Sequence, residues 1–324
     1  MITTPLCQLL GIEHPVLNAS MAGTATGELA AAVANAGGFG MIGGTSPGGA
    51  AWLHAQITQA RQRTRRPVGV GFISAFPDTP DLVAVALAAG VAAINHSFAD
   101  PTPYVEPAHA AGVRVFAQVQ TLRDAVRAAG AGVDVIIAQG GEAGGHAGSI
   151  GTFALLPAIV DAVAPIPVVA AGGIADGRGL AAALLLGAQG VWLGTRFMLS
   201  PEWGGPSWKQ QAALAATSDD TLQTGIYDRL LARPFPAGIN DRVVRNAFNE
   251  QWPGDAAEIE LSNQDLLNEL LRARERGDTT VAGVSAGVSS GLIRTVQPAA
   301  DIVHAIVREA EELLRERSRQ FAGS

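Results

Sequence analysis

The sequence predicts an α/β protein: a (β/α)8 TIM barrel with a smaller, mostly helical inserted subdomain. Three observations support this fold. Short apolar runs rich in β-branched residues recur at intervals of roughly 20–35 residues, the spacing of βα units, with Ala- and Leu-rich helical segments between them. Eight such runs are present, the number that closes a barrel. After residue 200 the alternation of apolar runs and helical segments stops for a long stretch. An open, doubly wound sheet is the alternative.

Each expected strand is a continuous apolar run, as in a parallel sheet covered on both faces. In chain order the runs are Pro15–Ala19, Phe39–Gly43, Val68–Ile73, Ala92–His96, Val113–Val119, Val133–Ala138, Val168–Ala171 and Val191–Gly194. Several intervening segments end in the Ala-Gly or Leu-Gly pair that stops a helix. The expected helices include Gly27–Ala36, Ala51–Arg63, Leu82–Ala89, Leu122–Ala129 and Gly179–Leu186.

The domain organisation follows from where the rhythm stops. We expect residues 1–200 to form the barrel, 201–277 a helical lid over its mouth, and 278–324 a segment that returns to the barrel. The middle part has helical stretches at Trp208–Ala216 and Asn263–Arg276, and the chain ends in an amphipathic helix, Pro298–Arg317. The alternative is that 201–277 only elaborates the final barrel helix.

Composition excludes several classes of function. The formal charge is −7 and no basic cluster is present, which argues against nucleic-acid binding. Cys7 is the only cysteine, which excludes an internal disulfide and a cysteine metal cluster, and Lys209 is the only lysine, which argues against a catalytic or P-loop lysine. No histidine pair has helical metal-site spacing, and no metal is expected. Without a membrane span or an apolar signal segment, we expect a cytoplasmic protein.

Two familiar motifs occur in the wrong context. Gly38–Gly43 fits the dinucleotide fingerprint G-x-G-x-x-G, but its glycines precede and overlap a strand instead of following one. Ser285 and Ser289 each lie in a G-x-S-x-G pattern, with Asp301 and His304 downstream. These last two residues share one expected helix, whereas a catalytic triad needs them on separate loops. We interpret both matches as accidental.

The richest chemical signal is a glycine-rich loop directly after the sixth expected strand. It runs from Gln139 to Gly148 and contains five glycines together with Glu142 and His146. Glycines let a backbone bend tightly and approach a ligand closely. A titratable histidine at the C-terminal end of a buried strand lies where α/β barrels carry their active sites. His146 is therefore the predicted catalytic residue.

The seventh and eighth strands are also followed by glycine turns. Gly172 and Gly173 precede a helix that begins near Asp176, and Gly194 and Thr195 follow the last strand. Backbone N–H groups and a helix N-terminus at these two strands form the usual phosphate site of a barrel enzyme. The phosphate would belong to a substrate or to flavin mononucleotide (FMN). Two ordinary tight turns are the alternative.

Together these motifs resemble the nitronate monooxygenase family, formerly called 2-nitropropane dioxygenases. The resemblance covers essentially the whole chain, and its most specific part is the run from Ala138 to His146. The turn at Ala171–Gly177 and the segment Leu193–Phe197 also match, as does the C-terminal stretch around Ser285–Gly287. The resemblance implies an FMN-binding barrel that oxidises alkyl nitronates with O2 to carbonyl compounds and nitrite.

It also implies roles for individual residues. His146 matches the family's active-site histidine, either as a hydrogen-bond donor to the nitronate or as a base toward a neutral nitroalkane. Gln118 stands where some members have a lysine, and Ser20 where proline is typical. His96 ends the fourth expected strand, so we expect it at the barrel mouth, near substrate. The implied cofactor-binding residues are Ser20, Met21, Ala22, Gln118, Gln139, Gly144, Gly172, Gly173, Gly194 and Thr195.

Other functions remain open at this stage. Related flavoproteins resemble NAD(P)H:quinone reductases or enoyl-acyl-carrier-protein reductases, which take hydride from a nicotinamide. A flavin-free barrel acting on a phosphorylated substrate would use the same glycine turns. A non-catalytic binding protein is a third alternative. The sequence does not determine the oligomeric state.

Overall fold

The computed structural model describes residues 2–252, 254 and 263–322. Eight parallel strands form one sheet in the order β1-β9-β8-β6-β5-β4-β3-β2. A parallel bridge between Leu17 and Phe39 joins the two edge strands and closes the barrel. The predicted (β/α)8 barrel is thus confirmed. Its strands are β1 Val16–Asn18, β2 Gly40–Gly43, β3 Val68–Ile73, β4 Ala93–Ser97, β5 Arg114–Val119, β6 Val135–Gln139, β8 Val168–Ala171 and β9 Gly190–Leu193.

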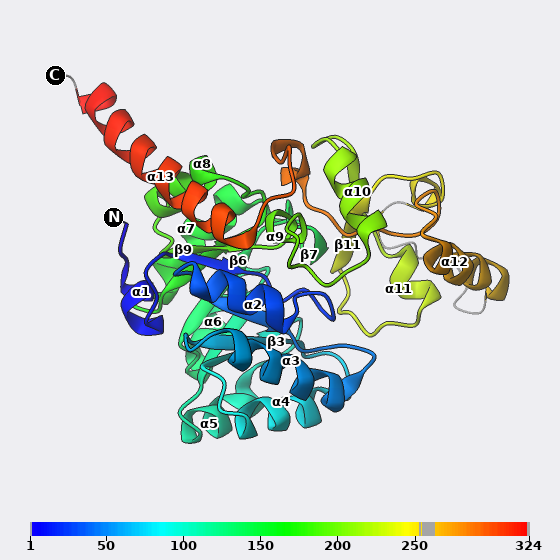
Figure 1. Cartoon of the computed structure of the whole chain (residues 1–324), viewed down its shortest axis with the longest axis horizontal. Coiled ribbons are helices and arrows are strands. Elements are labelled where there is room, and N and C mark those ends of the chain that lie inside the picture. The colour runs from blue at the N-terminus through cyan, green and yellow to red at the C-terminus, as the bar shows by residue number, and fades with distance from the viewer. Residues whose placement is uncertain (1, 253, 255–262, 323–324) are drawn as a thin grey trace.

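Helices surround the sheet, as Figure 1 shows. Several begin at side-chain caps: Thr26 accepts a hydrogen bond from Leu29 N, and Asp176 accepts from Arg178 N and Gly179 N. These caps define where the chain turns back along the outside of the barrel. The helices are α2 Gly27–Asn35, α3 Gly49–Arg63, α4 Thr79–Ala88, α5 Thr102–Ala110, α6 Leu122–Ala131, α7 Thr152–Val163, α8 Gly177–Leu185 and the short α9 Thr195–Met198.

The core has two layers because alternate strand residues face opposite sides of the sheet. In β4, Ala93 belongs to the cluster inside the barrel, whereas Ile94 belongs to the layer between strands and helices. Helix α1, Pro5–Leu10, adds Leu6 to the inner cluster. Leu6 lies beside Gly190 at the start of β9, so α1 covers the N-terminal end of the barrel. The C-terminal end of the barrel is therefore the end available for an active site.

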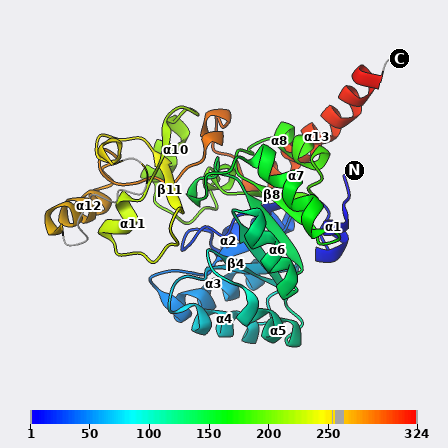
Figure 2. The same cartoon turned by 180° about the vertical axis from the view of Figure 1, so that it is seen from behind.

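The segment after α9 forms a small unit beside the barrel mouth (Figures 1 and 2). It includes a three-stranded antiparallel sheet in the order β10-β11-β7. Strand β7, Gly145–Ala147, comes from the glycine-rich loop of the barrel. The unit has its own apolar cluster around Tyr227, Phe248 and Leu270. Its other elements are α10 Ser207–Ala215, β10 Thr221–Thr224, α11 Ile226–Leu230, β11 Asn240–Val244, η1 Asn249–Gln251 and α12 Gln264–Arg276.

This small sheet adds to the mostly helical subdomain that the sequence predicts. Strand β7 has only three residues, one of them glycine, and its partner in β11 lies far along the chain. Local sequence patterns carry no signal for such a pairing. The exact division at residues 201 and 277 stays a prediction.

The C-terminal segment returns to the barrel. It runs through η2, Val288–Leu292, into α13, Ala299–Ala322, which packs against α8 and α2. Gly177 N, at the start of α8, donates a hydrogen bond of 2.7 Å to the Glu309 carboxylate. A Cβ atom on Gly177 would lie 2.5 Å from Ala310 N, so only glycine allows this approach. Among the described helices, none combines the length and apolarity needed to cross a membrane.

We expect Gly177→Ala to destabilise the protein by roughly 1–3 kcal/mol, because the added methyl overpacks two helix backbones. Urea denaturation measures this loss. The control is Gly130→Ala in α6, where a Cβ meets nothing within 4 Å. Removing a glycine from an open helical position stabilises by roughly 0.5–1 kcal/mol. Equal effects of the two substitutions would contradict the close packing of α13 on α8.

Candidate active site

The glycine turns after β8 and β9 form the floor of the site. Gly172 and Gly173 have φ values of +98° and +75°, in the left-handed region that glycine favours. A Cβ atom on Gly172 would lie 2.9 Å from Gly140 O, so this turn presses against the glycine-rich loop. Within the described part of the chain, the N–H groups of Gly173 and Gly194 have no hydrogen-bond partner. Such free N–H groups suit an anion.

The C-terminal segment joins these turns to the glycine-rich loop. Gly287 N donates a hydrogen bond of 2.9 Å to Thr195 Oγ1, which leaves the Thr195 hydroxyl proton to donate elsewhere. A Cβ atom on Gly144 would lie 2.4 Å from that same Gly287 N. Gly144, Gly172, Gly173 and Thr195 are therefore brought together, as members of one phosphate site would be. Gly287 is an additional member of this contact that the sequence analysis did not assign.

The turn after β1 lies beside β9. Ala19 N donates to Leu193 O at 2.8 Å, which places the Ser20–Ala22 turn next to Gly194. The Ser20 side chain lies against Gly71 of β3, where a Cβ atom would come within 2.0 Å of the serine hydroxyl. Met21 is partly buried and Ala22 is exposed. This small-residue turn thus borders the same end of the barrel.

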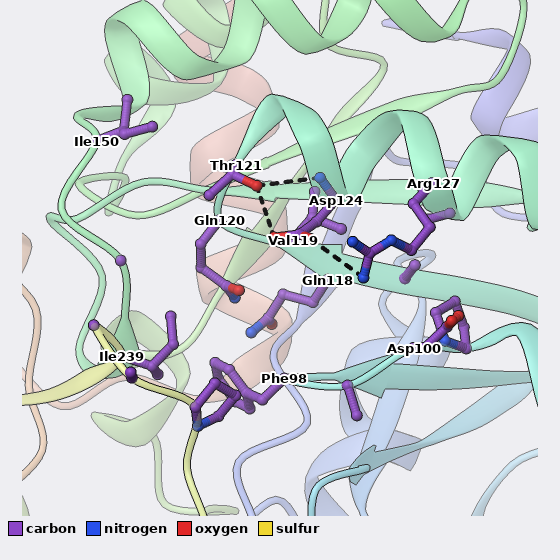
Figure 3. Close-up of a pocket in the computed structure, with 18 of the residues that line it drawn as sticks. Phe98, Asp100, Gln118, Val119, Gln120, Thr121, Asp124, Arg127, Ile150 and Ile239 are labelled. Atoms are coloured by element: carbon purple, nitrogen blue, oxygen red, sulfur yellow. Dashed lines mark hydrogen bonds and ion pairs between the residues drawn. The ribbon is translucent and has the colours of Figure 1, made fainter.

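Three glutamines connect β5, β6 and the glycine-rich loop. Gln139 Oε1 accepts hydrogen bonds from Gln118 Nε2 at 3.2 Å and from Gln120 Nε2 at 2.8 Å. Gln139 Nε2 then donates to the backbone oxygen of His146 at 3.0 Å. A cavity of about 490 Å³ opens beside this network, with Phe98 and Ile239 on its walls (Figure 3). Its size is that of a small-molecule site.

His146 lies at the centre of β7. Its Nε2 atom lies 2.7 Å from Asp228 Oδ2, and each of the two side chains is only 10% exposed. A carboxylate only accepts hydrogen bonds, so Nε2 carries the proton of this bond. Among the described residues, none forms a hydrogen bond with Nδ1. Asp228 therefore orients the ring and leaves Nδ1 to accept or donate a proton.

Aromatic rings enclose this histidine. The Phe235 ring stacks on it with a centroid distance of 3.4 Å and an interplanar angle of 8°. The Phe98 ring meets it edge-on at 6.0 Å. Phe98 has a φ of 66°, an uncommon conformation for a bulky residue that concentrates at functional sites. These rings exclude water from one side of the imidazole.

A second acid stands close to this pair. Asp241 is the register partner of His146 in the β7–β11 pairing, and its carboxylate accepts hydrogen bonds from Ser285 Oγ at 2.9 and 3.1 Å. Burial raises the pKa of Asp241, and the neighbouring Asp228 raises it further, whereas His146 acts against both. Arg233 Nη1 lies 3.6 Å from Asp228 Oδ1 and shares that carboxylate with His146.

Several of these residues could not be found from the sequence. Asp228 and Phe235 lie in the segment 201–277, within no recognisable motif, and only the fold brings them to His146. Phe98 follows the fourth strand almost directly, so its position at a strand end was the one available signal.

The structure places His96 in the layer between β4 and α5. Its ring stacks on Tyr104 at 4.4 Å, and its Nδ1 atom lies 2.7 Å from Ser74 Oγ. Burial lowers its pKa to about 4. Because strand residues alternate in direction, His96 faces the helices while its neighbour Asn95 faces inward and bonds Ser97. The side chain therefore contacts α5 and does not line the cavity.

The residues at the mouth fit FMN. The N–H groups of Gly173 and Gly194 and the Thr195 hydroxyl can hold a phosphate. The nearby Glu142 carboxylate accepts hydrogen bonds of 2.8–3.0 Å from Thr152 N and Oγ1. The close approaches at Gly144 and Gly172 leave no room for side chains there.

Comparison with known proteins shows the family of this chain. The family model described as nitronate monooxygenase matches residues 3–87 and 77–309. The chain belongs to the nitronate monooxygenase family. It is similar to a probable nitronate monooxygenase of Staphylococcus aureus, with 30% identity over 96% of this chain and 98% of that protein.

Two other relatives of this family member have different names. An octahydro-1H-indene-4-carboxyl-CoA dehydrogenase of Mycobacterium tuberculosis is 38% identical over 77% of this chain and 68% of its own length. The structure of FabK from Thermotoga maritima superimposes with a TM-score of 0.87 and 35% identity, covering 98% of this chain and 99% of that one. The protein is thus an enzyme of an oxidoreductase family.

The buried imidazole of His96 makes stability depend on pH. Its folded pKa, about 4, lies below the ordinary value of 6.5, so the unfolded chain binds a proton first as the pH falls. Stability is therefore lost between pH 6.5 and 4, by about 3 kcal/mol from this group. In His96→Phe, which keeps a ring but cannot titrate, urea denaturation should show a correspondingly smaller loss. His54→Phe, at an exposed position, should keep the wild-type pH dependence.

Proposed function

We propose that this protein is an FMN-dependent enzyme that oxidises alkyl nitronates with O2 to carbonyl compounds and nitrite. The observation that carries the proposal is the pair His146–Asp228. It presents one free imidazole nitrogen beside an apolar mouth and close to turns suited to a phosphate. Membership of the nitronate monooxygenase family supports the same substrate class.

FMN is proposed to bind across the C-terminal ends of β1, β8 and β9. Its phosphate would take the N–H groups of Gly173 and Gly194 and the Thr195 hydroxyl, next to Gly144 and Gly172. When bound, FMN supplies the redox chemistry, accepting electrons from the substrate and passing them to O2. Ser20, Met21 and Ala22 would lie along the flavin ring. The amides of Gln118 and Gln139 supply hydrogen bonds to its polar edge.

The protein's own residues would bind and orient the nitronate. Asp228 accepts the Nε2–H hydrogen bond and fixes the ring, so that in a protonated imidazole Nδ1–H can donate to a nitronate oxygen. With a neutral nitroalkane, unprotonated Nδ1 would instead remove the proton next to the nitro group. Phe98 and Phe235 form apolar walls for the alkyl group and exclude water from this charged contact.

Replacing either member of the pair tests this role. In His146→Asn and Asp228→Asn, we expect kcat/KM for a neutral nitroalkane to fall roughly 10²–10⁴-fold, because a positioned base is lost. With preformed nitronate the loss should be roughly 10–10²-fold, the worth of a charged hydrogen bond. Oxygen uptake and nitrite release measure both. Asp301→Asn, an exposed carboxylate on α13, is the control. Unchanged nitronate turnover in His146→Asn would refute the proposed role.

A flavin reductase is the second candidate. The similarity to a carboxyl-CoA dehydrogenase and to FabK favours an enzyme that exchanges electrons with a partner other than O2. An NAD(P)H:quinone reductase or enoyl-acyl-carrier-protein reductase would use the same phosphate turns and the same cavity. In these enzymes a nicotinamide, and not a nitronate, would face the flavin.

Anaerobic mixing separates the two candidates. We expect the flavin absorption band to bleach rapidly with an alkyl nitronate and to persist with NADH or NADPH, because the nitronate is the proposed electron donor. Stopped-flow absorbance measures both rates on the flavin-loaded protein. Rapid bleaching by NADH or NADPH, with none by nitronate, would contradict the monooxygenase and favour the reductase.

A further inference from the structure

A second cavity, of about 230 Å³, lies in the unit beside the barrel. Three cationic side chains line it: Lys209 from α10, Arg233 from the segment after α11, and Arg274 from α12. These residues are far apart in the sequence, so only the fold collects them. Trp208 and Tyr227 form part of the wall.

The described residues balance the positive charge of this cavity only in part, through Asp241 in its lining and Asp228 beside Arg233. Arg233 lies 3.6 Å from Asp228, which also holds His146. In the part of the chain that the structure describes, the side chains of Lys209 and Arg274 form no hydrogen bond or ion pair; the Lys209 ammonium lies over the Trp208 ring at 5.3 Å. Among the described residues Asp241 is the one acid in the lining, a single carboxylate beside three cations, and it also accepts hydrogen bonds from Ser285 Oγ.

The surroundings of Lys209 and Arg274 disfavour their charged forms. Burial lowers the pKa of Lys209, and Arg274 lowers it further. Burial also lowers the pKa of Arg274, with Arg233 as the next cause. Partly buried like charges that repel each other are costly unless an opposite charge offsets them. A multivalent anion between them would remove that cost.

We propose that this cavity binds the phosphate or pyrophosphate group of a ligand, a function beyond the proposed nitronate chemistry. Two guanidinium groups can each hold phosphate oxygens in a bidentate fork, and the ammonium adds a third, point-like charge. The volume is below the range of about 300–1,000 Å³ that holds whole drug-sized ligands. The cavity therefore suits a charged group, either as a free ion or as the end of a larger molecule.

The position of the cavity bears on whether the phosphate group is a free ion or the end of a larger molecule. Arg233 lines the cavity and contacts Asp228, and Asp241 lines it while pairing in register with His146. The phosphate site and the imidazole thus lie on two sides of the same pair of acids. A substrate or cofactor with a phosphate on one end could place its other end at the barrel mouth.

Isothermal titration of the FMN-loaded protein with inorganic pyrophosphate tests the site. We expect saturable binding that weakens at least tenfold in Arg274→Gln, because a charge-assisted bond is lost. The matched control is Arg272→Gln, an exposed arginine on the same helix that does not line the cavity. No binding by the wild type, or equal weakening in both variants, would overturn the proposal.

Lys209 allows a second test that needs no variant, because it is the only lysine in the chain. Pyridoxal 5′-phosphate carries an aldehyde that reacts with lysine and a phosphate that the cavity should hold. After borohydride reduction, peptide mass spectrometry should find Lys209 modified faster than by pyridoxal, which lacks the phosphate. Pyrophosphate should protect it. Equal labelling by both aldehydes, or no protection, would contradict a phosphate site.

Turnover with added pyrophosphate distinguishes the two sources of the group. If the phosphate belongs to a larger substrate or cofactor, pyrophosphate should compete with that molecule and raise its KM. If the site takes a free ion, pyrophosphate should bind with the KM of nitronate unchanged. Both results support a phosphate site. Titration and labelling do not depend on turnover, so these two experiments test the phosphate site separately from the nitronate proposal.

Discussion

The pairing of β7 with β11 is the constraint on which the site depends. It takes three residues out of a glycine-rich barrel loop and makes them the edge of a small antiparallel sheet. His146 is thereby held opposite Asp241 and within 2.7 Å of Asp228. Without this pairing the histidine would lie on a flexible glycine loop, since glycine restricts backbone conformation least. The geometry around His146 is therefore a property of two structural units together.

The two units contribute different chemistry. The barrel contributes mainly backbone groups at the ends of β1, β8 and β9. They are tight turns of small residues and N–H groups that have no partner among the described residues. The unit beside it supplies charge, with Asp228 and Asp241 next to the imidazole and three cations on the far side of these acids. This division has a steric reason. Glycine turns leave little room for side chains, whereas the small sheet and its helices can present many.

Much of the barrel could be predicted from local patterns. Buried parallel strands must be apolar on both faces, so runs such as Val68–Ile73 stand out in the sequence and appear unchanged as β3. The glycines at 172 and 173 also carried a usable signal, since left-handed turns after strands favour glycine. His96 shows the limit of this reasoning. The sequence ended this strand at His96, whereas β4 ends at Ser97. Which way the ring points depends on that register, because a shift of one residue turns a side chain to the other face.

The sequence by itself determined the eight-stranded rhythm, the glycine turns and the place of His146 in the glycine-rich stretch after the sixth barrel strand, because these features follow from local backbone and burial preferences. Only the tertiary structure decided what surrounds that histidine. Asp228, Phe235 and Arg233 reach it through contacts between segments distant along the chain. No periodicity or motif encodes such contacts; they arise when the helices and strands pack and bury their apolar faces.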